Sequence, residues 1–494
     1  MLRKLRIILA AISFTLVTLL FLDFTGAVHS WFGWMAKVQA LPAILALNLG
    51  IIIALVVLTL LFGRVYCSVI CPLGIMQDII SFFRKKRNKY GYKKPITWLR
   101  VTFLVLFVIV LIAGVGGVVT LLEPYSTFGA IASNLFAPLY GLGNNLLAMI
   151  AEKADSYAFY STEVYIRSIP VFIFAAVMFV IIFILAWKGG RTYCNTVCPV
   201  GTVLGTISKF SLFKPSFDLD KCNGCKLCAR NCRANCINPE EHKIDFSRCV
   251  ACMDCLNNCH QGAISYKLAV GKKHQNAERT DNQNNKGRRA FVSASAIIGI
   301  AAVANSQEQQ RMDGGLAVIL DKKVPAREHK IVPPGSISIK NMENHCVGCQ
   351  LCIMQCPNKV LIPRTDLMGF MKPQMTFEKG YCRPECTKCS EVCPAGAIKP
   401  LDVAEKSSTQ IGHAVVILDN CIAAKDGVSC GNCARHCPAG AIKLVRTNPD
   451  DNTSPRIPTV NTERCIGCGS CEFHCPSRPF GAIYIEGHDV HKTI

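Results

Sequence analysis

The stretch CIGCGSCEFHCP, residues 465–476, contains four cysteines with the spacing C-x2-C-x2-C-x3-C. In this spacing three closely placed thiolates hold one [4Fe–4S] cluster, and the fourth reaches a neighbouring cluster. The chain has 29 cysteines and contains six variants of this pattern. A disulfide framework does not require this regular spacing, and a zinc site usually combines two separated C-x2-C units. Both alternatives therefore fit the spacing less well than iron–sulfur clusters do. The sequence therefore predicts six [4Fe–4S] clusters.

Two of the six patterns lie in a first cysteine-rich unit, residues 214–270. Crossed ligation predicts two ligand sets there. The sets are Cys222, Cys225, Cys228 with Cys259, and Cys249, Cys252, Cys255 with Cys232. Cys236 is left over, and two interpretations stay open: a spare buried thiol, or a replacement for Cys232 as the distant ligand.

Four patterns lie in a second cysteine-rich unit, residues 340–494. We expect a nested arrangement, in which the first run pairs with the fourth and the second with the third, and sequential pairing of neighbours is the alternative. The nested sets are Cys346, Cys349, Cys352 with Cys475; Cys465, Cys468, Cys471 with Cys356; Cys382, Cys386, Cys389 with Cys437; and Cys421, Cys430, Cys433 with Cys393.

Long apolar runs fill the N-terminal part of a chain in which 51% of residues are hydrophobic. Runs at about residues 1–22, 41–62, 98–122 and 169–187 are each long enough to cross a bilayer. They predict a four-helix membrane bundle over residues 1–213, followed by α+β ferredoxin-like [4Fe–4S] domains. Basic residues at the helix ends place the N-terminus and the first cysteine-rich unit in the cytoplasm. Residues 123–167 then lie outside, with a candidate surface helix.

One internal repeat stands out in the bundle. GRVYCSVICPLG begins at Gly63 and GRTYCNTVCPVG at Gly190, each after a predicted helix. A parallel duplication would bring both motifs to the same end of the bundle. The cysteines of these two CxxxCP motifs are therefore a candidate shared metal site, and buried structural or redox-active thiols are the alternative. They are Cys67, Cys71, Cys194 and Cys198.

A polar, basic linker, residues 271–339, separates the two cysteine-rich units. It contains Arg288 and Arg289 ahead of a mildly apolar stretch, Ala290 to Ala304, which resembles a twin-arginine export signal. That route carries folded cargo, so we expect the second unit in the periplasm, with a cytoplasmic unit docked on the bundle as the alternative. The stretch is also a candidate fifth helix, although it is short for a span.

Other residues narrow the function. The formal net charge is +21, but six clusters at about −2 each would leave roughly +9, and no nucleic-acid motif occurs. Only His29 lies near a predicted membrane helix and no CxxCH motif occurs, which excludes haem and leaves iron–sulfur clusters as the electron carriers. Glu123 and Tyr125 are candidates for proton release, and a plain helix cap is the simpler interpretation.

With these motifs in hand, residues 1–270 resemble NapH/MauN-type membrane ferredoxins, and residues 286–487 resemble NapG/MauM-type ferredoxins. The segments that carry the second resemblance are RRAF at Arg288, the four cysteine runs, and IGHAVVILDNC ending at Cys421. The resemblance implies a component of the bacterial cytoplasmic membrane that takes electrons from quinol in the lipid and passes them to a periplasmic or membrane-bound reductase or cytochrome, as an electron-transfer subunit with quinol dehydrogenase activity.

Two features depart from that pattern: the fusion of both parts in one chain, and the missing proline after Cys232. A maturation or regulatory redox factor of the CcoG/NosR type, which shares CxxxCP motifs, is the alternative function. CcoG-type chains end in a β-sandwich rather than in four cysteine runs, which favours the electron conduit.

Overall fold

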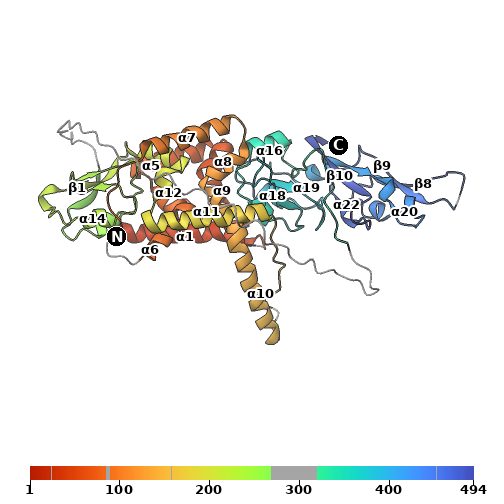
Figure 1. Ribbon diagram of the computed structural model, residues 1–494, viewed down its shortest axis with the longest axis horizontal. Coiled ribbons are helices and arrows are strands. Elements are labelled where there is room, and N and C mark those ends of the chain that lie inside the picture. Colours follow the sequence, from red (N-terminus) through yellow and green to blue (C-terminus); the bar gives the residue numbers. More distant parts are fainter. Residues whose placement is uncertain (24, 85–89, 157, 269–319, 452) are drawn as a thin grey trace, which may run out of the picture.

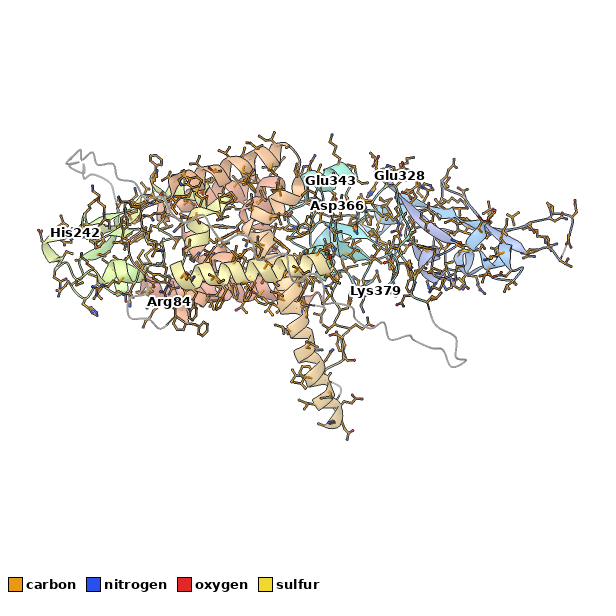
Figure 2. All side chains as sticks on the ribbon, viewed as in Figure 1. Arg84, His242, Glu328, Glu343, Asp366 and Lys379 are labelled. Atoms are coloured by element: carbon orange, nitrogen blue, oxygen red, sulfur yellow. The ribbon has the colours of Figure 1, made fainter. Side chains whose placement is uncertain are left out.

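The computed structural model describes residues 1–23, 25–84, 90–156, 158–268, 320–451 and 453–494. The molecule is elongated, with three parts in a row (Figure 1). The first cysteine-rich unit lies at one end, the helical bundle in the middle, and the second cysteine-rich unit at the other end. Figure 2 shows the same order in its labelled side chains, with His242 in the first unit and Asp366 and Lys379 in the second. The two units thus contact opposite ends of the bundle.

Two helices of the bundle are long and apolar enough to cross a membrane, α1 (Leu2–Leu22) and α11 (Ile169–Gly189). Each has 21 residues, which corresponds to about 31 Å. At the start of α1, Arg3 pairs with Asp254 of the first unit at 2.8 Å. At its end, the carbonyl of Leu20 accepts a hydrogen bond from Gln355 of the second unit at 3.2 Å. A helix of bilayer length therefore separates the two units.

The other two predicted spans are broken helices, so the expectation of four continuous ones is wrong. Residues 41–62 form α4 (Ala40–Leu45) and α5 (Leu49–Phe62), and residues 98–122 form α7 (Thr97–Ile112) and α8 (Gly116–Leu122). The breaks fall at Leu47, with φ 51°, and at Gly114, with φ 73°. A residue in this left-handed region cannot continue a right-handed helix.

Residues 123–167, which we expect on the outer side of the membrane with a surface helix, include a buried helix, α9 (Pro124–Ile131), all of whose residues are buried. This helix packs against α11 and against α6 (Pro72–Phe82). After a π-helical turn, η2 (Ala132–Phe136), α10 (Ala137–Lys153) projects from the body of the molecule (Figure 1). The remaining helices of the bundle are α2 (Ala27–Phe32), α3 (Trp34–Lys37), η1 (Tyr66–Ile70), α12 (Thr192–Thr196) and α13 (Pro199–Ser208).

The first cysteine-rich unit contains two antiparallel strand pairs and three short helices. Strand β1 (Phe213–Phe217) pairs with β4 (Ile264–Leu268), and β2 (Ile237–Asn238) pairs with β3 (Lys243–Ile244). The helices are η3 (Leu219–Lys221), α14 (Leu227–Arg230) and α15 (Asp254–Asn257). The small sheets leave the cysteines on the loops and helix starts between them.

The second unit has the same construction on a larger scale. Its antiparallel pairs are β5 (Leu361–Pro363) with β6 (Pro373–Met375), β7 (Thr409–Val416) with β10 (Ile483–Thr493), and β8 (Ile442–Arg446) with β9 (Arg456–Val460). Its helices are α16 (Ile339–His345), α17 (Leu351–Met354), α18 (Lys388–Glu391), α19 (Val403–Ser408), η4 (Leu418–Asn420), α20 (Ile422–Lys425), α21 (Asn432–Arg435) and α22 (Ser470–His474).

The second unit begins before residue 340, because residues assigned to the linker pack on it. Arg327 pairs with Glu472 at 2.6 Å, and the carbonyl of Ile331 accepts a hydrogen bond from the N–H of Met375 at 2.8 Å. The twin-arginine-like segment, residues 286–306, lies outside the described residues.

Candidate metal centres

The cysteine loops curl because residues between the cysteines adopt left-handed backbone. In the run that ends at Cys475, Gly467 has φ 75°. A Cβ there would lie 2.7 Å from the backbone nitrogen of Gly412, so both the conformation and the close approach require glycine. Gly469, at φ 78°, then precedes α22. These turns direct the three closely spaced thiols of the run toward one cavity.

Two cavities in the second unit are each lined by four thiols. One is lined by Cys437, Cys465, Cys468 and Cys471. The other is lined by Cys421, Cys430, Cys433 and Cys475. Each cavity thus combines the first three cysteines of one run with the last cysteine of the other, so that Cys437 of the third run lies with the fourth run and Cys475 of the fourth run lies with the third. Burial raises the pKa of the Cys433 thiol to about 11, so an empty site would hold it protonated and a metal centre would have to displace that proton.

The first two runs of the second unit pair in the same way. Cys352 interacts electrostatically with Cys346, Cys349 and Cys393, and least with Cys389, and Cys346 and Cys349 interact with Cys393 as well. Cys389 interacts with Cys382, Cys356 and Cys386.

The nested arrangement expected from the sequence is therefore wrong, and the sequential alternative holds. In the structure the thiol of Cys393 is grouped with the first run, that of Cys356 with the second, that of Cys475 with the third and that of Cys437 with the fourth. The spacing within each run is the same in both arrangements, so only the packing of neighbouring runs could decide between them.

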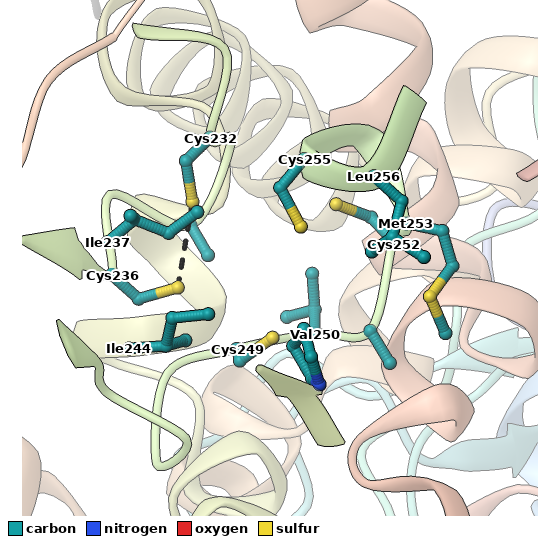
Figure 3. Close-up of a pocket in the computed structure, with 13 residues that line it drawn as sticks. Cys232, Cys236, Ile237, Ile244, Cys249, Val250, Cys252, Met253, Cys255 and Leu256 are labelled. Atoms are coloured by element: carbon teal, nitrogen blue, oxygen red, sulfur yellow. Dashed lines mark hydrogen bonds between the residues drawn. The ribbon is translucent and has the colours of Figure 1, made fainter. Parts of the chain in front are cut away.

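In the first unit, Cys232, Cys249, Cys252 and Cys255 line one cavity together with Cys236 (Figure 3). The first four are a set that crossed ligation predicts. The Sγ atoms of Cys236 and Cys232 lie 3.6 Å apart.

For the other set of this unit, Cys228 interacts electrostatically with Cys225 and Cys222. Cys259, its predicted distant ligand, accepts a hydrogen bond from the N–H of Ala263 at 3.3 Å.

A backbone pattern distinguishes Cys232 from Cys236. Cys437 accepts a hydrogen bond from the N–H group four residues later, that of Ala441, at 3.3 Å, as Cys259 does from Ala263. The N–H four residues after Cys232 is that of Cys236, and it too donates to the Cys232 sulfur. Cys236 thus occupies the alanine position of a C-x3-A-I motif, and Cys232 occupies the ligand position. This register was readable in the sequence, but the spacing of cysteines alone does not reveal it.

Hydrogen bonds also favour the thiolate form of Cys232. A hydrogen bond from the Cys236 thiol, helped by backbone N–H groups, lowers the pKa of Cys232 to about 7 despite its burial. Cavities lined by four thiols, with backbone N–H groups directed at sulfur, suit [4Fe–4S] clusters, whose ligands are thiolates stabilised by such bonds. Among the residues that the structure describes, no group of three or more side chains could hold a single metal ion.

The cysteines of the two CxxxCP motifs come together inside the bundle as one quartet. Cys67, Cys71, Cys194 and Cys198 are each at most 5% exposed. Cys198 interacts electrostatically with the other three, and Cys71 with Cys194 and Cys67. The structure therefore brings together the four residues that the repeat singled out.

The two repeats interlock through their arginines. Arg191 donates a hydrogen bond to the carbonyl of Cys67 at 2.6 Å, and Arg64 donates one to the carbonyl of Cys194 at 3.2 Å. Each guanidinium also fills the space above a glycine of the other repeat, Gly74 or Gly201. The GRxYCx3CPxG motif thus encodes a symmetric contact between its two copies.

Arg64 is a buried cation without a carboxylate among the described residues. It is fully buried and donates to Asn195 at 2.8 Å and to the carbonyl of Ser247 at 3.1 Å. Its Nη2 atom also lies 3.7 Å from the Cys67 sulfur. Burying an uncompensated charge costs several kcal/mol, about 3–5 when a partner is removed. Thiolates, or an anionic centre held by them, would supply the missing negative charge.

A second group of buried charges surrounds Asp78. This carboxylate pairs with Arg191 at 2.7 Å, with Arg233 at 3.3 Å, and with Arg6. Arg233 belongs to the first cysteine-rich unit and also pairs with Asp254 at 2.8 Å. The network joins α1, α6, the second CxxxCP motif and the first unit, so it holds the quartet against that unit.

On the other side of the quartet, tyrosines and a buried acid lead toward the second unit. Tyr193 interacts electrostatically with Cys198 and Glu123, and Tyr125 with Glu123 and Cys349. Glu123 caps α9 by accepting a hydrogen bond from the N–H of Ser126. The simpler interpretation of Glu123, a helix cap, is confirmed, and proton release stays a prediction.

Two protein-family models match the chain. One, described as a 4Fe-4S binding domain, matches residues 45–90 and 171–218, which contain the two CxxxCP motifs. The other, described as a 4Fe-4S dicluster domain, matches residues 381–441 and 427–478. Both models describe iron–sulfur binding, in agreement with the thiol cavities.

Three relatives are similar to parts of the chain. The methylamine utilization ferredoxin-type protein MauM of Methylophilus methylotrophus is 31% identical over 30% of this chain and 67% of its own. The ferredoxin-type protein MauN of Paracoccus denitrificans is 27% identical over 43% of this chain and 58% of its own. The regulatory protein NosR of Stutzerimonas stutzeri is 26% identical over 37% of this chain and 22% of its own. No solved structure matches the chain.

Proposed function

We propose that this chain, which belongs to the ferredoxin-type iron–sulfur electron-transfer proteins, carries electrons from quinol to an acceptor outside the cytoplasmic membrane. Its clusters would be the six predicted from the cysteine runs. The observation that carries the proposal is that the thiol sets follow one another along the molecule, with the CxxxCP quartet between the two cysteine-rich units.

The contacts at the first unit join its cavity to the quartet. Arg64 interacts electrostatically with Cys249 and lies 3.7 Å from the Cys67 sulfur. One guanidinium thus stands between the nearest thiol set of the first unit and the quartet.

The contacts at the second unit are as close. A Cβ on Gly129 of α9 would lie 2.3 Å from the carbonyl oxygen of Cys349. Asn134 donates a hydrogen bond to Gln350 at 3.0 Å, and Thr120 donates one to the carbonyl of Phe370 at 3.2 Å. The first cysteine run of this unit therefore packs directly on the bundle, toward the tyrosines that lie beside the quartet.

A centre held by the quartet would remove a difficulty of the sequence-based account. If the two units lie on opposite sides of a membrane and no haem is present, electrons need a carrier within the bundle. The quartet supplies four thiols there, and Arg64 and Arg191 supply positive charge for an anionic centre. A thiolate-ligated cluster at this position would complete a path between the units.

The proposed direction of electron transfer and the proposed partners are based on two observations. One is the resemblance to the NapH/MauN and NapG/MauM types, and the other is the position of the two cysteine-rich units at opposite ends of the bundle. Helices α1 and α11 suit a membrane location, the first unit the cytoplasmic side, and the second unit the periplasmic side. The acceptor would be a periplasmic or membrane-bound reductase or cytochrome that meets the second unit.

A second function has one observation in its favour. The similarity to NosR, which is a regulatory protein, is compatible with a regulatory or maturation role that uses the same redox centres. An electron conduit turns over many electrons per molecule, whereas a regulator need only change its redox state.

The test uses the full chain in lipid nanodiscs under anaerobic conditions. A reduced quinol analogue is mixed with the oxidised protein, and cluster reduction is followed by visible absorbance and EPR. Reduction by quinol supports the proposal. If quinol leaves every cluster oxidised while a reduced soluble ferredoxin reduces them, the assigned donor is wrong.

A further inference from the structure

A cavity of about 300 Å³ lies where the end of α1 meets the second cysteine-rich unit. Its bundle side is formed by α2 and α3, and its other side by Gln355, which follows α17, and by α18 with Val392, which follows it. The lining residues that bear on function are His29, Trp31, Trp34, Lys37, Gln355 and Lys388. This volume is at the lower end of the usual range, roughly 300–1,000 Å³, for sites that bind small molecules or cofactors.

We propose that this cavity binds the quinol ring and is the place where its electrons enter the protein. The inference rests on the proposed function and adds the location of its substrate. The occupant would be a membrane quinol, an aromatic diol with an isoprenoid tail.

The position relative to the thiol sets is the main argument. Three lining residues, Gln355, Lys388 and Val392, immediately precede cysteines of the second unit in the sequence. The first two precede Cys356 and Cys389, which belong to one set, and the third precedes Cys393, which belongs to the neighbouring set. A molecule in the cavity would therefore lie beside two sets at once.

That position suits the stoichiometry of quinol oxidation. A quinol that becomes a quinone loses two electrons and two protons, and a [4Fe–4S] cluster accepts one electron at a time. The two adjacent sets would take one electron each. The two protons would leave to water through the open mouth of the cavity.

The aromatic side chains suit an amphipathic ligand. Trp31, in α2, is 78% exposed and Trp34, in α3, is 57% exposed. Both helices follow the end of α1, the helix of bilayer length. Tryptophan is enriched at the membrane–water interface, where its ring contacts both lipid headgroups and acyl chains. An isoprenoid tail could pass between these rings into the lipid while the quinol ring stays in the cavity.

His29 supplies a polar contact for a hydroxyl group. Its side chain lines the cavity. Burial, assisted by the Lys37 ammonium group, lowers the pKa of His29, so the imidazole is neutral at pH 7. A neutral ring nitrogen accepts a hydrogen bond from a quinol hydroxyl.

The experiment compares His29→Ala and Ser30→Trp with the unchanged protein, all as full chains in nanodiscs. Ser30 lines the cavity, so a tryptophan there fills it. Trp187→Phe, on α11 near the first unit, is the matched control. A menaquinol or ubiquinol analogue is the reductant, and dithionite measures the total reducible clusters. We expect at least a ten-fold slower quinol reduction in both cavity variants, with unchanged dithionite reduction and an unchanged control.

Binding gives a readout that is independent of electron transfer. The oxidised quinone should quench tryptophan fluorescence in the unchanged protein, and the quenching should be lost in Ser30→Trp after correction for the added ring. If quinol reduces the unchanged protein and both cavity variants equally fast, the cavity is not the site. If quinol reduces none of them but quinone still quenches, and the quenching is lost in Ser30→Trp, the cavity stands as a quinone site and the proposed direction falls. The absence of both reduction and quenching overturns both.

Discussion

The two interfaces of the bundle are built from different chemistry. Toward the first cysteine-rich unit the contacts are buried ion pairs, centred on Asp78 and Asp254. Toward the second unit they include neutral hydrogen bonds and close backbone contacts, such as Gln355 with Leu20 and Gly129 with Cys349. An ion pair on this side, Lys359 with Glu163, is exposed rather than buried. With the proposed anionic centre in the quartet, the interface beside it would supply positive charge, while the other interface would need only close packing.

The largest effect is expected when the charged interface loses its shared carboxylate. Asp78→Asn leaves Arg6, Arg191 and Arg233 without their common partner, and breaking such a buried network costs about 3–5 kcal/mol. Thermal unfolding of the full chain in detergent, followed by circular dichroism, measures the loss.

Asp366→Asn is the control for this prediction. The Asp366 side chain is 41% exposed. In this variant its partner Arg364 would still form an ion pair with Glu343, at 3.0 Å. A partly exposed pair contributes at most about 1 kcal/mol, so this variant should unfold almost as the unchanged protein does. Equal losses in both variants would mean that the charged interface has no special role.

At the neutral interface the expected effect is smaller and steric. Gly129→Ala places a methyl group against the carbonyl of Cys349, and overpacking of this kind costs about 1–3 kcal/mol. The matched control is Gly143→Ala in α10, where a Cβ would meet nothing within 4 Å and where alanine favours the helix by about 0.5–1 kcal/mol.

Unfolding temperatures should therefore move in opposite directions for the two glycine variants. Limited proteolysis should release the second unit faster in Gly129→Ala than in the unchanged protein. A Gly129→Ala protein as stable and as resistant as Gly143→Ala would show that the close approach to Cys349 is not needed for docking.

A smaller change tests the charge around the quartet. Asn195→Asp is nearly isosteric and places a carboxylate 2.8 Å from the Arg64 guanidinium, which neutralises this buried cation. More negative surroundings disfavour the reduced, more negative form of a centre, so the reduction potential of the quartet centre should fall. Redox titration followed by EPR measures it, with Asn448→Asp in the exposed loop after β8 as control. An unchanged or higher potential would contradict the assigned role of Arg64.

The smallest effect is expected at Cys236. Because it occupies the position that alanine holds after Cys259 and Cys437, Cys236→Ala should leave the iron content unchanged. Cys232→Ala should lose one cluster, or roughly four iron per chain. The reverse outcome, with iron lost only from Cys236→Ala, would make Cys236 the ligand.

The sequence predicted the chemistry of this protein better than its three-dimensional arrangement. Cysteine spacing identified the three closely spaced thiols of each set, because a cluster requires a fixed spacing of cysteines in its loop. The GRxYCx3CPxG repeat identified the quartet. Spacing did not identify which distant cysteine serves which run. Cys475 and Cys393 have the same local motif, and only the packing of neighbouring runs assigns them.

The helices show a similar limit. Apolar composition marked the positions of α5 and α7, but it did not reveal the breaks at Leu47 and Gly114, which depend on how the bundle packs. Nor did hydropathy predict that α9 lies inside the bundle. The charged network around Asp78 was invisible in the sequence, since its members are far apart along the chain and meet only after folding.

The central claim is that the two repeats share one redox centre that links the two units. Its most direct test is iron analysis and EPR of four full-length variants, each with one quartet cysteine changed to serine. The account predicts that Cys67→Ser, Cys71→Ser, Cys194→Ser and Cys198→Ser all lose the same spectroscopic component and the same amount of iron, while the clusters of both units remain. Unchanged iron in all four, or the loss of different components from the two repeats, would contradict it.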